Sequence, residues 1–467
     1  MSSTLPTIIQ GGMGIAVSDW RLANAVSRTG QLGVVSGTAI DGVLVRRLQR
    51  GDPDGHVRRA LAAFPLPEVA DRILDKYFVE GGIPSGQPFK RGPMPRERQS
   101  SLGEDLLVLA NFVEVHLARE GHDSPVGINF LEKIQVPTLA SIFGSILAGV
   151  DYVLMGAGIP RAIPRVIDEL SVGKPSSLRF DVKGLTGEPP ETSFDPTRYL
   201  HGGSELTRPD FLGIVSSHVL ATMLARLDSP ADGFIVEGDT AGGHNAPPRG
   251  KPTFTADGQP IYSDRDRANL GAMRDLGLPF WLAGGQASPE ALARALSEGA
   301  AGIQVGTAFA FCEESGLDPD LKRRVITEAL SGGVSVFTDP VASPTGFPFK
   351  TITIESNEPE RERVCDLGYL RVAYERDDQT IGWRCPSEPV DQYVRKGGAI
   401  EDTEGRKCLC NALMANIGLG QIREGDRVEP PIITAGDDLD SIRRFLPEGA
   451  DSYSAADVIE GLLASRT

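Results

Sequence analysis

The sequence predicts a (β/α)8 TIM barrel of the α/β class, and three observations support this fold. Short apolar runs that end in Gly, Asn or Ser recur through the first two thirds of the 467 residues. Segments of helical period separate most of them, and both faces of each strand are therefore covered, as in parallel sheets. Eight such units within about 300 residues match the size of one barrel.

The eight predicted strands follow one another along the chain. They are TIIQGG (7–12), LGVVSG (32–37), PVGINF (125–130), DYVLMG (151–156), FLGIVSS (211–217), GFIVEG (233–238), PFWLAGG (279–285) and GIQVGT (302–307). Helical patterns follow several of them, at 20–30, 219–227 and 289–300. SLRFDVKG competes for the fifth position, but FLGIVSS is preferred because it leads directly into a helix and then into GFIVEG.

Two insertions and a C-terminal extension complete the predicted organisation. Residues 38–124 and 171–210 are each longer than a single connection between two barrel strands requires, so we predict insertions there. Within the first, residues 80–95 are rich in Pro and Gly, which predicts a loop. Residues 1–330 are therefore expected to form the barrel. Residues 331–467 are expected to form an extension packed on it, with a helix near 454–465.

Composition and charge narrow the class of protein. The chain has 40% hydrophobic and 24% charged residues, a net charge of −16, and no long basic run. These values predict a soluble protein that acts on a small molecule and binds no nucleic acid. No apolar stretch reaches the roughly 18 residues of a membrane span, and the N-terminus lacks the basic and apolar regions of a signal peptide. We therefore expect no membrane contact and a cytoplasmic location. The sequence is compatible with a monomer or an oligomer.

The loops after the last two predicted strands indicate a phosphate site. Active sites of these barrels lie at the carboxyl ends of the strands, where the seventh and eighth loops commonly hold a phosphate. Here these loops carry Gly284 and Gly285, then Gly306 and Thr307. Glycines let backbone N–H groups approach phosphate oxygens, although a glycine pair after a strand can also be only a tight turn.

Several strand-end motifs together resemble a known family. IIQGGMG, VGINF, EGDTAGGHN, LAGGQAS and GIQVGTAF occur in this order over roughly residues 7–312. They are similar to those of the nitronate monooxygenase (2-nitropropane dioxygenase) family of FMN-dependent barrels. The resemblance implies that Gln10, Gly11, Gly12 and Met13 lie beside the flavin ring, that Asn129 contacts it, and that Gly242 and Gly243 line its floor. It also places Gly284, Gly285, Gly306 and Thr307 on the FMN phosphate.

The same resemblance assigns His244 as the catalytic residue above the flavin. In a nitronate monooxygenase the imidazole would bind an alkyl nitronate, which O2 converts to a carbonyl compound and nitrite. The alternative within the family is an NAD(P)H-dependent enoyl reductase acting on carrier-bound enoyl chains in fatty acid or polyketide synthesis. A flavin-binding scaffold is a further alternative, and His244 could instead be a loop histidine that caps a backbone carbonyl.

Glu237 and Asp239 depart from the pattern expected of nitronate oxidases, which more often have an uncharged residue at the first position. A carboxylate there could repel an anionic nitronate or pair with Arg249 or Lys251 outside the pocket. We favour pairing.

Four of the five cysteines cluster in the extension: Cys365, Cys385, Cys408 and Cys410. Four thiolates suffice for a zinc ion or an iron–sulfur cluster, and such a cluster could pass electrons to the flavin. Buried free thiols are the third interpretation, because the spacing lacks paired CxxC motifs. Our hypothesis is that one metal ion pins the extension.

Overall fold

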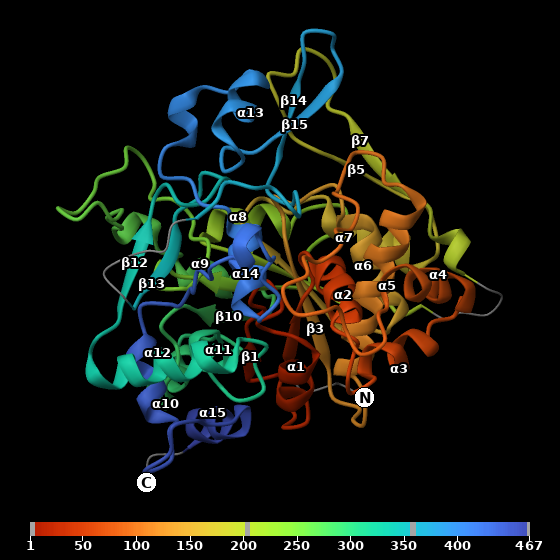
Figure 1. Cartoon of the computed structure of the whole chain (residues 1–467). Coiled ribbons are helices and arrows are strands. Elements are labelled where there is room, and N and C mark those ends of the chain that lie inside the picture. The colour runs from red at the N-terminus through yellow and green to blue at the C-terminus, as the bar shows by residue number, and fades with distance from the viewer. Residues whose placement is uncertain (1–4, 201–205, 355–360, 465–467) are drawn as a thin grey trace.

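The computed structural model describes residues 5–200, 206–354 and 361–464, and eight parallel strands form its central barrel (Figure 1). Along the chain these strands are β1 (Ile8–Gln10), β2 (Gly33–Ser36), β3 (Val126–Leu131), β4 (Tyr152–Gly156), β8 (Asp210–Val215), β9 (Gly233–Glu237), β10 (Phe280–Ala283) and β11 (Gly302–Val305). Hydrogen bonding runs in the order β1, β11, β10, β9, β8, β4, β3, β2. A parallel bridge between Ile9 and Leu32 closes the ring. The (β/α)8 prediction and all eight predicted strands are confirmed.

The fifth barrel position belongs to β8, between β4 and β9, which confirms the choice of FLGIVSS. SLRFDVKG instead forms β5 (Ser176–Arg179) and β6 (Val182–Lys183) outside the barrel. β5 pairs with β7 (Glu191–Phe194) in an antiparallel hairpin, which is followed by the short turn η1 (Pro196–Tyr199). The charged residues of this segment would be buried on both faces of a barrel strand, which explains its position at the surface.

Helices follow the strands as predicted. They are α1 (Trp20–Ser27), α6 (Thr138–Leu147), α7 (Ile163–Ser171), α8 (His218–Leu224), α9 (Leu270–Arg274), α10 (Pro289–Ser297), α11 (Thr307–Ala310) and α12 (Pro319–Ser331), with a short turn η2 (Asp264–Asp266) before α9. Local sequence fixes several starts. Ser288 Oγ accepts a hydrogen bond from Ala291 N at 3.0 Å, and Pro289 opens α10 behind this cap.

The first insertion contributes α2 (Ile40–Gln49), α3 (His56–Ala62), α4 (Pro67–Tyr77) and α5 (Ser101–Ala118). Residues 80–95 contain neither helix nor strand, as expected. No described helix is long and apolar enough to cross a membrane.

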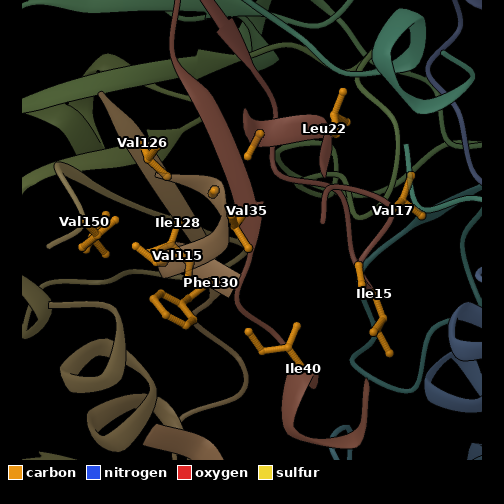
Figure 2. Packing of buried hydrophobic residues seen from close by; sticks show 14 of the residues in the cluster. Ile15, Val17, Leu22, Val35, Ile40, Val115, Val126, Ile128, Phe130 and Val150 are labelled. Carbon is orange, nitrogen blue, oxygen red and sulfur yellow. The ribbon is translucent and has the colours of Figure 1, made fainter. Parts of the chain in front are cut away.

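Apolar side chains pack on both faces of the strands. Within the barrel lie Ile9, Leu32, Val34, Tyr152, Leu154, Leu212, Ile235, Trp281 and Ala283. The alternate residues face the helices: Figure 2 shows Val35, Val126 and Ile128 of β2 and β3 beside Val115 of α5. This alternation explains why the strands are apolar throughout, and it determines which residues point into the barrel.

The described residues after α12, 332–354 and 361–464, form no further barrel unit, and we call them the C-terminal region. Its elements are β12 (Ser335–Asp339), β13 (Phe349–Thr353), β14 (Val372–Glu375), β15 (Ile381–Arg384), α13 (Val390–Arg395), η3 (Ile400–Thr403), α14 (Leu409–Asn416), η4 (Glu424–Asp426), η5 (Leu439–Arg444) and α15 (Ala455–Leu463). β14 pairs with both β15 and β6, which ties this region to the second insertion. The predicted terminal helix is α15, which packs on α1, α10 and α11.

Candidate active site

A pocket of about 260 Å³, the inner pocket, lies at the carboxyl ends of the barrel strands. It is lined by every predicted cofactor and catalytic residue except Gln10, namely Gly11, Gly12, Met13, Asn129, Gly242, Gly243, His244, Gly284, Gly285, Gly306 and Thr307. These residues come from five segments that are far apart in the sequence. The barrel brings them together because parallel strands present all their carboxyl ends at one face.

Gln10, which is also predicted to lie beside the flavin ring, does not line the inner pocket. Its side chain is fully buried within the barrel wall. Nε2 donates a hydrogen bond to Ser18 Oγ at 2.8 Å, and Oε1 accepts one from Val34 N at 3.0 Å. Since the side-chain amide of Gln10 joins β1 to β2 and to the segment after β1, we assign it a role in closing the barrel.

The glycine pair after β10 has the backbone conformation that favours glycine. Gly284 and Gly285 have φ values of +88° and +62°. A Cβ atom on Gly284 would lie 2.9 Å from Thr240 Oγ1 and 3.1 Å from Ala241 N. A larger residue is therefore excluded, and the backbone of this loop stays open to a ligand.

Gln304 adds an unpaired acceptor to the inner pocket. It lies on β11 between Ile9 and Ala283 of the neighbouring strands and lines the pocket. Its buried Oε1 has no hydrogen-bond partner. A ligand with an N–H or O–H group would satisfy this oxygen, and its present isolation favours such a ligand.

The C-terminal region completes the inner pocket, which the sequence did not indicate. Thr434 Oγ1 accepts a hydrogen bond from Gly243 N, and Thr307 Oγ1 accepts one from Gly436 N, both at 2.9 Å. The Thr307 hydroxyl also bonds to Asp438, a carboxyl group whose pKa is raised by burial. Residues 434–438 thus lie over the loops predicted to hold a phosphate.

His244 lies in the turn after β9 and is held by the same region. Its Nε2 is 2.7 Å from Ser343 Oγ, and its ring packs edge-on against Phe349 with centroids 4.8 Å apart. Asn245 N donates to Pro348 O at 3.0 Å on the neighbouring segment. Burial lowers the pKa of His244 to about 4, so its ring is neutral at physiological pH. The ring's partner is a hydroxyl group rather than the backbone carbonyl of the alternative interpretation.

A second and larger pocket, the outer pocket, lies beside the first. Its volume is about 850 Å³, and the segment after β4, the β5–β7 hairpin and the loop after β9 form its walls. Ala157, Ile214, Glu237 and His244 line both pockets. These four residues therefore form the boundary between the two pockets.

The expected ion pairs of Glu237 and Asp239 are not found among the described residues. Arg249 instead donates through its backbone N to Asp266 at 2.7 Å and through its guanidinium group to Ser216 O at 3.4 Å. Glu237 lies on the interior face of β9, and burial raises its pKa to about 7. The preferred explanation, pairing with Arg249 or Lys251, is therefore wrong.

The four clustered cysteines lie around one small cavity. Cys365, Cys385, Cys408 and Cys410 all line it, and Cys410 also lines the inner pocket. Burial raises the pKa of each thiol. Across the described ranges, no group of three or more His, Cys, Asp or Glu side chains is arranged to hold a metal ion. The cysteines therefore converge as expected, but the metal hypothesis stays a prediction.

Residues 205–357 match the family model described as nitronate monooxygenase. This segment contains β8 to β11 and His244, so the match falls on the half of the barrel that carries the predicted catalytic histidine, and it supports the resemblance found in the sequence. No curated protein matches the chain.

Solved structures that match this chain include FabK from Thermotoga maritima, at 17% identity and a TM-score of 0.48, covering 98% of this chain and 91% of that one. Another is a nitroalkane oxidase from Streptomyces ansochromogenes, at 15% identity and a TM-score of 0.48, covering 98% and 94%. Since both TM-scores lie below 0.5, the fold assignment rests on the closed order of the strands.

Proposed function

We propose that this chain, which carries the nitronate monooxygenase match over residues 205–357, is an FMN-dependent oxidoreductase that oxidises alkyl nitronates with O2 to a carbonyl compound and nitrite. The observation that carries this proposal is the position of His244. It lies within the matched segment, at the boundary of the two pockets, and is neutral. The inner pocket would then hold the cofactor and the outer pocket the substrate.

The inner pocket has the groups that FMN requires. Gly284, Gly285 and Gly306 offer backbone N–H groups to the phosphate, and Thr307 lies beside them. Gly11, Gly12, Met13, Asn129, Gly242 and Gly243 would line the ring, and the unpaired Gln304 Oε1 would accept from a ring N–H. When bound, FMN accepts electrons from the substrate and delivers them to oxygen.

His244 would orient the substrate through its free nitrogen. Nδ1 has no hydrogen-bond partner in the part of the chain that the structure describes, while Nε2 contacts Ser343. With the Ser343 hydroxyl donating to Nε2, the single proton of the neutral ring lies on Nδ1. This N–H can donate to an oxygen of the nitro group and hold the α-carbon toward the inner pocket.

An anaerobic flavin-reduction screen tests this function. Propane-2-nitronate should bleach the flavin of the purified holoenzyme, and NADPH should not. Bleaching by NADPH alone would reject nitronate oxidation and favour the second candidate, an NAD(P)H-dependent enoyl reductase for carrier-bound chains. No reduction by either reagent, with stoichiometric FMN, would favour a flavin-binding scaffold.

The outer pocket is the observation that favours the second candidate. About 850 Å³ is at the upper end of the range for drug-sized ligands and exceeds what a small nitronate fills. Lys133 and Arg161 line it and form no ion pair with any described residue, so they could bind an anionic group of a longer substrate.

We also propose the division into a flavin-binding barrel, residues 1–330, and an extension, 331–467, pinned by one metal ion at the four cysteines. The convergence of four sulfurs on one cavity supports this. Binding must displace the thiol protons and draw the sulfurs closer. Elemental analysis should find about one zinc ion, or one iron–sulfur cluster, per chain; less than about a tenth of an equivalent of either metal would reject the site.

A further inference from the structure

Glu237 projects into the barrel mouth because of its position on β9. Side chains of a strand alternate between its two faces, and Ile235, two residues earlier, lies in the barrel interior. Glu237 also pairs in register with Ala283 of β10, another interior residue. Its carboxyl group therefore faces the space above the barrel core, where it lines both pockets.

This carboxyl group has no partner among the described residues. The Glu237 side chain forms no hydrogen bond or ion pair in the ranges 5–200, 206–354 and 361–464. Burial alone raises its pKa, without any contribution from a nearby charge. The side chain is half-buried and lines both pockets, so its unpartnered carboxyl group is accessible to a ligand there. A pocket carboxyl group with a raised pKa is typical of sites where a proton is transferred.

His244, the predicted catalytic residue, is poorly suited to take a proton. Its Nε2 is occupied by Ser343 Oγ at 2.7 Å. Its pKa, lowered to about 4 by burial, makes the ring a weak base at neutral pH. Hydrogen-bond donation to the substrate suits His244 better than proton abstraction.

We propose that Glu237 is the catalytic base that removes the α-proton of a neutral nitroalkane, so that the enzyme accepts nitroalkanes as well as preformed nitronates. The inference rests on the proposed function. In this step the α C–H bond breaks, its electron pair moves into the nitro group to give the nitronate, and the proton passes to a carboxylate oxygen of Glu237. Glu237 becomes neutral as the substrate becomes an anion, so the two do not repel each other.

Several titratable groups line the two pockets together with Glu237. They are Asp239 and His244 after β9; Glu132, Lys133 and Arg161 after β3 and β4; Arg165 on α7; Arg179, Asp181 and Glu191 of the β5–β7 hairpin; Arg249, Tyr262 and Asp266 before α9; and Tyr369, Cys410 and Asp438 of the C-terminal region. Burial raises the pKa of Tyr262, Tyr369 and Cys410 further above the neutral range. The Glu237 carboxylate, with a pKa of about 7, forms as pH rises, so abstraction should increase with pH and level off above this value.

The test compares two substrates and two readouts in the holoenzyme. Anaerobic flavin reduction is followed with 2-nitropropane and with propane-2-nitronate over a pH series that brackets 7. Separately, NMR follows α-hydrogen exchange of 2-nitropropane in D2O with the flavin reduced beforehand, so that proton transfer is seen without oxidation. The matched control is Asp210→Asn, which changes another carboxyl group of burial-raised pKa, at the opposite end of the barrel on β8.

We expect Glu237→Gln to lower exchange, and reduction by 2-nitropropane, by on the order of 10² or more, while reduction by the nitronate changes by less than about threefold. The pH break near 7 should disappear in this variant and persist in the control. Glu237→Asp, which keeps a carboxyl group, should retain the break with slower exchange.

If Glu237→Gln exchanged the α-hydrogen at the wild-type rate, the proposal would be overturned. An equal loss of flavin reduction with both substrates would also overturn it, because it would indicate a structural role. Loss of exchange in His244→Asn alone would assign the base to His244. Failure of the nitronate to reduce the wild-type flavin rejects the proposed function instead, and the exchange measurement still decides the role of Glu237.

Discussion

The barrel and the C-terminal region contribute different things to the candidate site. The barrel supplies residues that line the inner pocket, such as Gly284, Glu237 and His244. The C-terminal region supplies the contacts that hold them, through Ser343 on His244 and Thr434 on Gly243. Reactive groups thus lie on a rigid scaffold, and a second layer fixes their orientation.

The largest effect is expected for the barrel residue His244. His244→Asn should leave FMN bound but lower turnover by on the order of 10² or more, the usual size of a proton-transfer or polarisation effect. Steady-state kinetics and the flavin content of the purified variant measure both. Because the pKa of His244 is lowered to about 4, the wild-type rate should show no inflection from this residue near its usual value of 6.5. Unchanged turnover in the variant would make His244 a structural residue.

The contact of Ser343 with His244 should matter less than His244 itself. Ser343→Ala removes one hydrogen bond from the imidazole, and a loss of about 1.4 kcal/mol corresponds to about a tenfold lower kcat. FMN affinity should not change. Ser441→Ala is the matched control, because its buried hydroxyl in the same region has no partner. Equal effects of the two substitutions would show that His244 does not need this support.

The contact of Thr434 with Gly243 should affect cofactor binding rather than chemistry. Thr434→Val keeps the side-chain shape but leaves the Gly243 N–H without its acceptor, which costs about 1 kcal/mol. We expect roughly fivefold weaker FMN binding and a lower midpoint of thermal unfolding, with kcat at saturating FMN unchanged. Fluorescence titration of the apoprotein measures the affinity. A changed kcat with unchanged affinity would contradict this assignment.

The smallest effect, a change in FMN affinity, is expected at Asp438 of the C-terminal region, whose negative charge should disfavour a phosphate held by the barrel loops. Its carboxyl group bonds to the Thr307 hydroxyl at the predicted phosphate site. Asp438→Asn removes a negative charge there, so FMN should bind about threefold more tightly, an effect that salt reduces. Weaker binding in the variant would show that the carboxyl group contacts the cofactor favourably.

Much of the barrel could be predicted because its strands and strand-end loops follow local sequence patterns. Apolar runs indicate strands, and glycines at strand ends indicate places where a ligand can approach the backbone. The segments around Gly12, Gly243 and Gly284 could therefore be placed from the sequence. The direction of a side chain was harder to predict. Gln10 seemed to face the ring, but its amide closes the barrel wall, because its hydrogen bonds go to Ser18 and to Val34.

The contacts of the C-terminal region could not be predicted, for a physical reason. Ser343 lies 99 positions from His244, and Thr434 lies 191 positions from Gly243. A hydroxyl group in a turn has no periodicity that indicates its distant partner. The cysteines were the exception, because their rarity and clustering predicted one location without giving its chemistry.

The 191 positions between Gly243 and Thr434 also have a consequence for how the protein is made. A ribosome adds about 5–20 residues per second, so Gly243 emerges roughly 10–40 s before the residue that caps it. During that interval Gly243 N lacks the hydroxyl acceptor that Thr434 supplies, and the inner pocket lacks the wall that Thr434, Ala435, Gly436 and Asp438 form. The inner pocket is therefore complete only after the C-terminal region has been synthesised.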